Sequence, residues 1–422
     1  MAGERTRQIP RRGFVLSLAA TILTMAAASA PSLFYPQIAD RLGLIPVATT
    51  LVFAVYTLTL LVALLFLGPL SDLIGRRPVV AAGSVALALS LAMFWFAGSL
   101  AALLFARALQ GFAAGLLIPA LSAMMIDFEP PSRPNIAALW NTIGPMIGLG
   151  TGALGAALLL DLTPEPTTAV FGLLVLAFLI VAATVWGTPE LVPKNRIRGG
   201  DLRPRFTVPL RLRRMFTAGL PAIIAGWATN GLFLALGAGI VSSELGGATH
   251  THAGFVLFAL ASSGIVASSI LQRCTARTIS LYATSALAFG TAASIGALIL
   301  GSYPAYVASV AIVGSGFGTA FLGVLRTLMP QTDSSERAAV MAMIYTVSYL
   351  AFGVPTIVAG LLVPGLTLSG TMTVLGAIII ALSLTATFLR LRIPQSVTRP
   401  LETADLLADS HRRAAPIREE RP

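Results

Sequence analysis

Charged side chains are scarce in this chain. Asp, Glu, Lys and Arg make up 11% of its 422 residues, whereas soluble domains carry roughly 25%. Hydrophobic residues account for 56%, and the mean hydropathy is +0.85. This composition excludes an ordinary soluble domain and is typical of a protein that crosses a membrane several times.

Cysteine and lysine are nearly absent. Cys274 is the one cysteine, so neither an intramolecular disulfide nor a thiolate metal site can form, and redox chemistry is not expected. Lys194 is the one lysine, and it does not belong to the Gly-rich loop with which an ATP-driven pump binds phosphate. The apolar runs contain no cluster of nucleophiles, acids or histidines. We therefore expect no enzyme, no metal and no other cofactor.

Long apolar runs separated by short polar breaks continue from Phe14 to near Leu389. A membrane-spanning helix needs about 20 apolar residues, so roughly twelve spans fit. The predicted fold class is therefore an all-α membrane protein with about twelve transmembrane helices. Its predicted segments are a cytoplasmic tail over 1–13, a six-helix bundle over 14–187, a linker over 188–214, a second six-helix bundle over 215–390 and a cytoplasmic tail over 391–422.

The basic residues are placed asymmetrically. All 28 Lys and Arg except Arg41 and Arg107 fall in the tails, the linker or alternate connections, and such residues concentrate in cytoplasmic loops. Both termini are therefore predicted to be cytoplasmic, in a multi-pass protein of the plasma (inner) membrane. The net charge of +11 then reflects topology, so no nucleic-acid partner is expected. The linker is predicted to be solvated and to contact anionic membrane lipids.

A densely charged turn connects the apolar runs 51–67 and 79–97. It begins at Gly68 and consists of Gly-Pro-Leu-Ser-Asp-Leu-Ile-Gly-Arg-Arg-Pro. Gly68 lets two helices approach closely, and Gly75 permits a turn that a Cβ would hinder. Asp72 can accept hydrogen bonds from the N-terminus of a neighbouring helix, whose dipole attracts anions. The turn is therefore predicted to hold helix ends together at the cytoplasmic surface.

This turn, with Gly68, Asp72, Gly75, Arg76 and Arg77 at these spacings, resembles the loop motif of the major facilitator superfamily. The basic linker and the division into six plus six helices strengthen the resemblance, which covers almost the whole chain. It implies two pseudo-symmetric six-helix bundles that rock against each other, so that a small-molecule site opens to either side of the membrane in turn.

In that superfamily, the turn takes part in a gating charge relay with an acid after the fourth helix and with the start of the eleventh helix. The resemblance implies that Asp72, Arg76 and Asp127 form the relay and that the eleventh helix begins near Arg337. These contacts would hold the outward-open state and break when the bundles rock. The alternative is that the charges only cap helix ends and fix the topology.

Arg107 is the charged residue placed inside an apolar run. It opens Arg-Ala-Leu-Gln-Gly, which resembles a pattern on the superfamily's fourth helix. A charge at the centre of a span costs about 2.5–3.5 kcal/mol or more, and such residues mark functional sites by default. We predict that Arg107 and Gln110 serve binding or proton coupling, with Asp40, at the outer end of the first span, as the carboxylate partner. The alternatives are snorkelling to the outer surface or structural pairing.

The fifth apolar run contains Gly144-Pro145-Met-Ile-Gly148-Leu-Gly150. It resembles the glycine-proline motif of the superfamily's antiporters, although Leu149 stands where a glycine is expected and the glycine upstream is also replaced. The physical expectation is a kinked helix whose small-residue face seals against a partner helix. This partial match favours export.

Polar, aromatic and proline residues in the helices that line the superfamily's cavity are candidate binding residues. They are Pro31, Tyr35, Gln110, Asn141, Trp227, Asn230, Phe317, Tyr345 and Tyr349. The alternative for each is core packing or lipid contact. A cavity with aromatic rings and few charges suits hydrophobic or weakly polar solutes. A His-x-His motif at His250 and His252 is predicted to lie in a solvated loop rather than in a metal site.

The favoured function is a monomeric secondary exporter of small hydrophobic compounds or drugs. Protons are the candidate coupling ion, although no carboxylate lies within an apolar run. The alternatives to proton coupling are an uncoupled facilitator or coupling through the charge of the substrate. A uniporter or symporter for sugars or other metabolites is the alternative function, and a membrane sensor that does not transport is a third.

Overall fold

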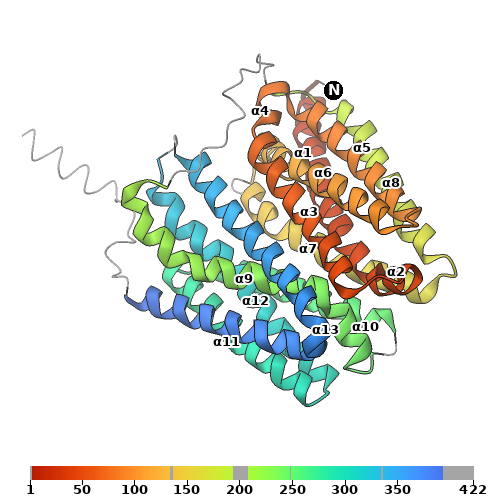
Figure 1. The fold of residues 1–422 in the computed structure, drawn as a ribbon. Helices are drawn as coiled ribbons and strands as arrows, with labels where there is room; N and C mark the ends of the chain where they lie inside the picture. Colours follow the sequence, from red (N-terminus) through yellow and green to blue (C-terminus); the bar gives the residue numbers. More distant parts are fainter. Residues whose placement is uncertain (1, 134–135, 193–207, 248, 334–335, 393–422) are drawn as a thin grey trace, which may run out of the picture.

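The computed structural model of this chain describes residues 2–133, 136–192, 208–247, 249–333 and 336–392. Every regular element within these ranges is a helix (Figure 1). Most of the predicted linker bases and nearly all of the predicted C-terminal tail lie outside the described residues. We call residues 2–192 the first half and residues 208–392 the second half.

The first half contains eight α-helices and two 3₁₀ turns. They are α1 (Ala2–Ser29), η1 (Ala30–Phe34), α2 (Tyr35–Leu42), α3 (Pro46–Leu67), α4 (Leu70–Ile74), α5 (Arg76–Trp95), α6 (Leu100–Asp127), α7 (Ile136–Leu162), α8 (Pro166–Thr184) and η2 (Val185–Gly187). The second half consists of α9 (Leu210–Ser243), α10 (His250–Leu271), α11 (Ala276–Ile299), α12 (Tyr303–Leu328), η3 (Met329–Gln331) and α13 (Arg337–Arg392).

The first long helix is interrupted before the end of the first apolar run. α1 ends at Ser29, and Pro31 lies in the first turn of η1, where its missing N–H leaves no donor unpaired. Pro36 starts α2 in the same way, and α2 stops at Gly43, whose φ of 61° is left-handed. The polar residues that follow the first apolar run therefore form a short helix rather than an irregular loop.

Eleven helices in the described ranges are long and apolar enough to cross a membrane. The last of these covers 54 residues, Ala339–Arg392, and would be about 80 Å long at 1.5 Å per residue, whereas a bilayer core is about 30 Å thick. Within it, Thr367 has φ 64° and ψ 176°, and two helices meet at this kink. Figure 1 shows the chain turning back near the label of α13. α13 is therefore two helices in sequence.

The two halves pack their helices in the same pattern. In the first half, α1 contacts α6 and α7, α3 contacts α6, and α5 contacts α6 and α8. In the second half, α9 contacts α12 and α13, α10 contacts α12, and α11 contacts α12 and α13. The halves meet where α3 packs on α13 and α7 packs on α10. Each half therefore contributes its own second and fifth long helix to the interface, counting α13 from its first part.

Small residues let these interface helices approach closely. A Cβ at Gly360 of α13 would overlap the side chain of Thr50 on α3, and a Cβ at Gly254 of α10 would overlap that of Ala157 on α7. Small residues are typical of helix contacts in membranes, where lipid supplies no hydrophobic driving force between helices. The interface is therefore built mainly by close van der Waals packing.

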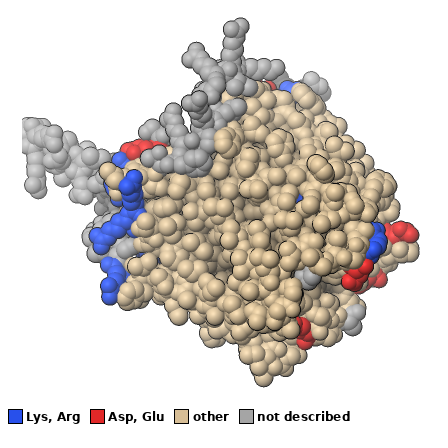
Figure 2. Space-filling view, in the orientation of Figure 1, with Lys and Arg blue, Asp and Glu red and all other residues tan. Residues whose placement is uncertain are grey.

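Contacts between helix ends define two opposite faces of the molecule. Asp161, near the end of α7, bonds to His250, at the start of α10, and we call this end the Asp161 face. Arg76, at the start of α5, pairs with Asp127, at the end of α6, and we call this end the Arg76 face. In the view of Figure 2, most of the surface between the charged edges is uncharged, as lipid contact requires.

Both ends of α13 lie on one face and its kink lies on the other. Glu336, just before α13, pairs with Arg211 at the start of α9, and Arg277, at the start of α11, donates to a carbonyl in the last turn of α13. In contrast, Glu244, at the end of α9, accepts from the backbone N–H of Ser369, just after the kink, at 2.9 Å. Because α9 runs from one face to the other, these contacts show that α13 crosses to the opposite face, turns at its kink and returns.

Candidate functional site

Arg107 lies on α6 and is completely buried, with 0% of its surface exposed. Its Nε donates to the hydroxyl of Tyr35 at 2.5 Å, and its Nη1 donates to Oε1 of Gln110. The guanidinium carbon also lies 5.2–5.3 Å from the ring centres of Tyr35, Tyr56 and Phe94. These contacts exclude snorkelling to the surface. They hold the charge in place by hydrogen bonds and cation–π contacts.

One nitrogen of this guanidinium is unused, because Nη2 of Arg107 is buried without a hydrogen-bond partner in the described part of the chain. Among the described residues no carboxylate pairs with Arg107, and Asp40, the predicted partner, is exposed on α2. The structure therefore does not form the predicted Asp40–Arg107 pair: the pair would have required the acid at the end of the first span to reach the interior, and α2 carries it to the surface instead. An acceptor on a bound molecule could satisfy Nη2.

Several of the predicted cavity residues form one aromatic cluster in the second half. Trp227 of α9 is its centre, with ring-centre distances of 5.2 Å to Tyr349 and 6.0 Å to Phe317. Tyr345 continues the cluster, 6.4 Å from Tyr349. Nε1 of Trp227 is also buried without a partner. The cluster thus combines aromatic surface with an unused donor, which is the combination expected of a site for weakly polar aromatic compounds.

The Arg107 group and the aromatic cluster are adjacent across the two halves. Tyr56, one of the rings beside Arg107, belongs to the same buried apolar cluster as Tyr349, and Trp227 packs against that cluster. The first half therefore supplies a cation and the second half supplies aromatic surface. We call the two together the central site.

The remaining candidate binding residues have structural surroundings of their own. Pro31 and Asn230 are buried, and Asn141 of α7 donates to the carbonyl of Ser122 on α6 at 3.3 Å. Gln110, besides contacting Arg107, donates to the carbonyl of Ala27 on α1 at 2.7 Å. Gln110 therefore anchors the Arg107 group to α1.

The charged turn forms an ionic cluster on the Arg76 face. Nε of Arg76 donates to Oδ2 of Asp127 at 2.9 Å, and its Nη1 contacts both Asp72 and the hydroxyl of Ser71. The side chain of Arg76 is 11% exposed, that of Asp127 27% and that of Asp72 62%. The predicted grouping of Asp72, Arg76 and Asp127 is present, while its role in gating stays a prediction.

Glu190 is a member of this cluster that the sequence did not reveal. Its carboxylate accepts from the backbone N–H groups of Arg76 and Arg77, each at 3.0 Å, and so caps the N-terminus of α5. Arg77 meanwhile stacks on Trp186, 5.2 Å from its ring centre. Gly75, with φ 103°, brings α4 and α5 together at the point where this carboxylate approaches, and a Cβ there would overlap it. This acid, at the start of the predicted linker, thereby ties the end of the first half to the turn.

If this cluster gates transport, as the resemblance implies, Asp127→Asn should slow transport more than Asp72→Asn. Asp127 is the less exposed partner of Arg76, and a hydrogen bond to a charged group contributes about 1.5–3 kcal/mol, so a loss of roughly 10- to 100-fold is expected. An exposed pair such as Asp72–Arg76 contributes about 0–1 kcal/mol, so its loss should cost at most about fivefold. Initial transport rates in proteoliposomes test this order, and the reverse order would indicate that Asp72 acts through another contact.

The glycine-proline segment of α7 packs on two neighbours. Gly148 lies against α1, where a Cβ would overlap the carbonyl of Ile22, whereas Gly150 lies against α10, where a Cβ would be 3.0 Å from that of Ala261. Gly144 also faces α1 but with more room, and Pro145 lies inside the helix. The predicted small-residue face is therefore present on both sides of α7, one side toward its own half and one toward the other half.

Gly148→Ala is expected to destabilise the protein by about 1–3 kcal/mol, because the new Cβ overlaps backbone that cannot move freely. Gly155→Ala, on the same helix, is the matched control: nothing lies within 4 Å of the point where its Cβ would stand, so it should leave stability unchanged or raise it by up to about 1 kcal/mol. Thermal unfolding in detergent measures both. Equal melting temperatures would contradict close packing at Gly148.

Asp161 makes the most extensive polar contact between the two halves. Its carboxylate accepts from the backbone N–H groups of His250 and Thr251, at 3.0 and 2.8 Å, and from Nδ1 of His250 and the hydroxyl of Thr251, at 2.8 and 2.5 Å. Nε2 of His250 lies 3.1 Å from Nε2 of Gln37. His250, which is predicted to lie in a solvated loop, is therefore the first residue of α10, and its contact with Asp161 joins α7 to α10.

Taken together, the fold is that of a multi-pass α-helical membrane protein. The sequence profile of the Major Facilitator Superfamily matches residues 17–354, so the chain belongs to this superfamily. It is 33% identical over 153 residues to the multidrug resistance protein MdtL of Shewanella oneidensis, 35% of this chain and 38% of that protein. It is 32% identical over 260 residues to the multidrug efflux pump LfrA of Mycolicibacterium smegmatis, 57% of this chain and 48% of that protein.

A third relative is the puromycin resistance protein pur8 of Streptomyces alboniger, 31% identical over 152 residues, 34% of this chain and 30% of that protein. The chain thus aligns with less than half the length of each of these three relatives. Their names refer to resistance and efflux.

Proposed function

We propose that this protein exports small, weakly polar aromatic compounds by alternating access, with the central site as the substrate site. The observation that carries the proposal is the fully buried Arg107, whose Nη2 finds no partner within the described ranges, next to the aromatic cluster around Trp227. The two unused donors favour a substrate that carries oxygen acceptors, and the rings favour an aromatic one. The names of the three relatives support export of drugs.

The proposed topology has twelve spans in two six-helix bundles, over 14–187 and 215–390, joined by the basic linker. The eleven candidate spans support it, because the last of them, α13, counts as two. The contacts of Glu244 and Arg277 place the kink of α13 on one face and its end on the other. The Arg76 face is proposed to be cytoplasmic, together with both termini, and the protein is proposed to act as a monomer in the inner membrane.

The single cysteine of the sequence offers a test of this orientation. Cys274 lies between α10 and α11, is partly exposed, and its carbonyl accepts from Arg326 at the end of α12, so it belongs to the Arg76 face. A maleimide that cannot cross membranes should label Cys274 in inside-out vesicles and not in intact spheroplasts. Cys274→Ser is the control for background labelling. Labelling from outside intact spheroplasts would reverse the proposed orientation.

The proposed conformational cycle exchanges contacts on the two faces. The polar contacts between the halves at Asp161 lie on one face, and the Arg76 cluster on the other face is made within the first half. Opening of the Asp161 face requires these inter-half bonds to break. The structure therefore corresponds to a state in which the face that we propose to be external is closed. The Arg76 cluster is formed in this state as well, which does not fit the expectation that its contacts hold the outward-open state and break when the bundles rock.

Transport of radiolabelled chloramphenicol into proteoliposomes tests the function. This probe is a neutral aromatic amide with oxygen acceptors, and its charge does not change with pH, so a gradient cannot trap it passively. A proton-coupled exporter should accumulate it in vesicles with an acidic interior, and a protonophore should abolish the accumulation. Equilibration of chloramphenicol without accumulation would indicate an uncoupled facilitator. Flux of sugars instead of chloramphenicol would favour the uniporter or symporter. Absence of flux for a panel of drugs and sugars would favour the remaining alternative, a membrane sensor that does not transport.

A further inference from the structure

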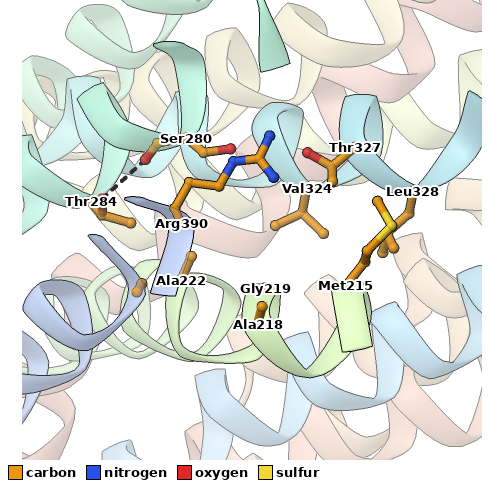
Figure 3. A pocket seen from close by; sticks show the side chains of 11 residues that line it. Met215, Ala218, Gly219, Ala222, Ser280, Thr284, Val324, Thr327, Leu328 and Arg390 are labelled. Carbon is orange, nitrogen blue, oxygen red and sulfur yellow. Dashed lines mark hydrogen bonds between the residues drawn. The ribbon is translucent and has the colours of Figure 1, made fainter. Parts of the chain in front are cut away.

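A small pocket lies inside the second half, away from the central site. It has a volume of about 30 Å³, on a measure by which one water needs about 10–15 Å³, so it has room for about two waters or one tetrahedral oxyanion. Helices α9, α11, α12 and the end of α13 enclose it (Figure 3). The start of α9 and the end of α13 place the pocket on the Arg76 face.

A buried arginine points into this pocket. Arg390 is 8% exposed, and its Nε and Nη2 are both buried without a hydrogen-bond partner among the residues that the structure describes. Figure 3 shows its guanidinium directed between Ser280 of α11 and Thr327 of α12. The hydroxyls of both residues donate within their own helices, to the carbonyls of Ala276 and Gly323 at 2.7 and 2.8 Å. The pocket therefore offers a cation with two free donors.

The surroundings of Arg390 are positively charged. Arg277 donates to the carbonyl of Leu391 at 3.3 Å, next in sequence to Arg390, and Arg390 itself takes part in none of the ion pairs of the described residues. Arg211 already pairs with the acids Asp333 and Glu336 near the start of α13. In Figure 2 basic residues gather at the left edge, where α13 ends. A buried and uncompensated cation is costly, so an anion at this position would stabilise the folded protein.

We propose that the Arg390 pocket binds a phosphate oxyanion. A guanidinium matches the geometry of a phosphate, because its parallel N–H groups can donate to two oxygens at once. The proposal rests on the topology proposed above, in which the pocket opens at the cytoplasmic membrane surface. At that depth the phosphate of an anionic lipid headgroup and free cytoplasmic phosphate both have access, and basic pockets between helices are known to hold lipid headgroups there.

The experiment compares thermal unfolding of the full chain in nanodiscs of phosphatidylcholine with and without phosphatidylglycerol. Anionic lipid is expected to raise the melting temperature of the wild type and to have no such effect on Arg390→Gln. Arg392→Gln is the matched control, because Arg392 lies two residues away, is exposed and stacks on Phe388 at 4.1 Å from its ring centre. In phosphatidylcholine alone, Arg390→Gln should melt above the wild type, since it removes an uncompensated buried charge.

A second arm identifies the source of the oxyanion. Inorganic phosphate, added to protein in lipid-free detergent with chloride as the control anion, should stabilise the wild type if free phosphate binds. Stabilisation by phosphatidylglycerol without any effect of inorganic phosphate would identify the lipid headgroup. Native mass spectrometry should show about tenfold less bound phospholipid or phosphate in Arg390→Gln, consistent with the loss of a charge-assisted bond.

Two outcomes would overturn the proposal: no stabilisation of the wild type in either arm, or equal stabilisation of the wild type and Arg390→Gln. If Arg390→Gln does not fold, Gly219→Val serves in its place. A Cβ at Gly219 would lie 3.6 Å from Val324 across the pocket, so valine fills the space and leaves Arg390 intact. This variant should also lose the response to anionic lipid, and retention of the full response would equally contradict a ligand in the pocket.

Discussion

Arg107→Ala is expected to reduce chloramphenicol transport by about 10- to 100-fold, the factor that corresponds to losing one or more hydrogen bonds from a charged donor. The reduction follows if Nη2 of Arg107, which has no partner among the described residues, donates to the substrate. The alanine also leaves Tyr35 and Gln110 without their buried partner, so the protein should lose stability as well. Transport rates therefore have to be normalised to folded, inserted protein.

Arg107→Met separates the two effects. A methionine retains much of the side-chain volume without the charge, and replacing a buried charge by an apolar residue is often neutral or stabilising. We expect Arg107→Met to unfold at or above the temperature of Arg107→Ala and still to be defective in transport. Arg107→Lys should rescue only in part, because an ammonium group cannot reproduce the fork that reaches Tyr35 and Gln110. Wild-type transport by Arg107→Met would reduce Arg107 to a structural residue.

The helices of this protein can be predicted from sequence because apolar length is the dominant signal in a membrane. The division of the chain into two halves at the basic linker can be predicted for the same reason. The break in α13 is readable from apolar length, since one predicted span ends at Val363 and the next begins at Leu366. The backbone conformation at the kink is not readable, because Thr367 adopts a positive φ of 64° that side chains other than glycine rarely take. Likewise, the break after Ser29 depends on how Pro31 and Pro36 begin new helical turns.

The sites are predictable where a local motif carries them and not where the tertiary fold creates them. The resemblance to the superfamily's loop motif predicts that Arg76 and Asp127 belong to one cluster, and the structure brings them together. Glu190 gives no signal, because it lies within the predicted linker and reaches α5 only through the fold. The Asp40–Arg107 pair is expected from sequence because no nearer carboxylate can be found. Aromatic rings and an amide surround the buried guanidinium instead, a solution that a count of acids cannot reveal.

Asp161 shows how strongly the contact between the halves can depend on one residue. The sequence does not single it out, because an acid just after an apolar run resembles an ordinary loop residue, and His250 lies 89 positions away. In the fold, Asp161 accepts the first N–H groups of α10, which otherwise lack partners within the helix. The neutral tautomer of His250 with its proton on Nδ1 can donate to Asp161 while Nε2 accepts from Gln37.

Asp161→Ala is expected to shift the conformational equilibrium toward opening of the Asp161 face. Hydrogen bonds to a charged group contribute about 1.5–3 kcal/mol, so losing their net effect should change the equilibrium by roughly 10- to 100-fold. Spin labels at Gly98 and Leu300, in a Cys274→Ser background, report the separation of the halves on this face. Both positions are exposed, in the connections between α5 and α6 and between α11 and α12.

Pulsed electron paramagnetic resonance should show one short distance between the two spin labels in the parent, and an additional longer distance in Asp161→Ala. Glu165→Ala is the matched control, because Glu165 is an exposed acid four residues away with no hydrogen bond to α10 among the described contacts. If both variants lengthen the separation equally, the effect is one of net charge at this face. If neither does, close packing at Gly254 and Gly360 holds the halves together without the carboxylate, and the proposed exchange of contacts is wrong at this end.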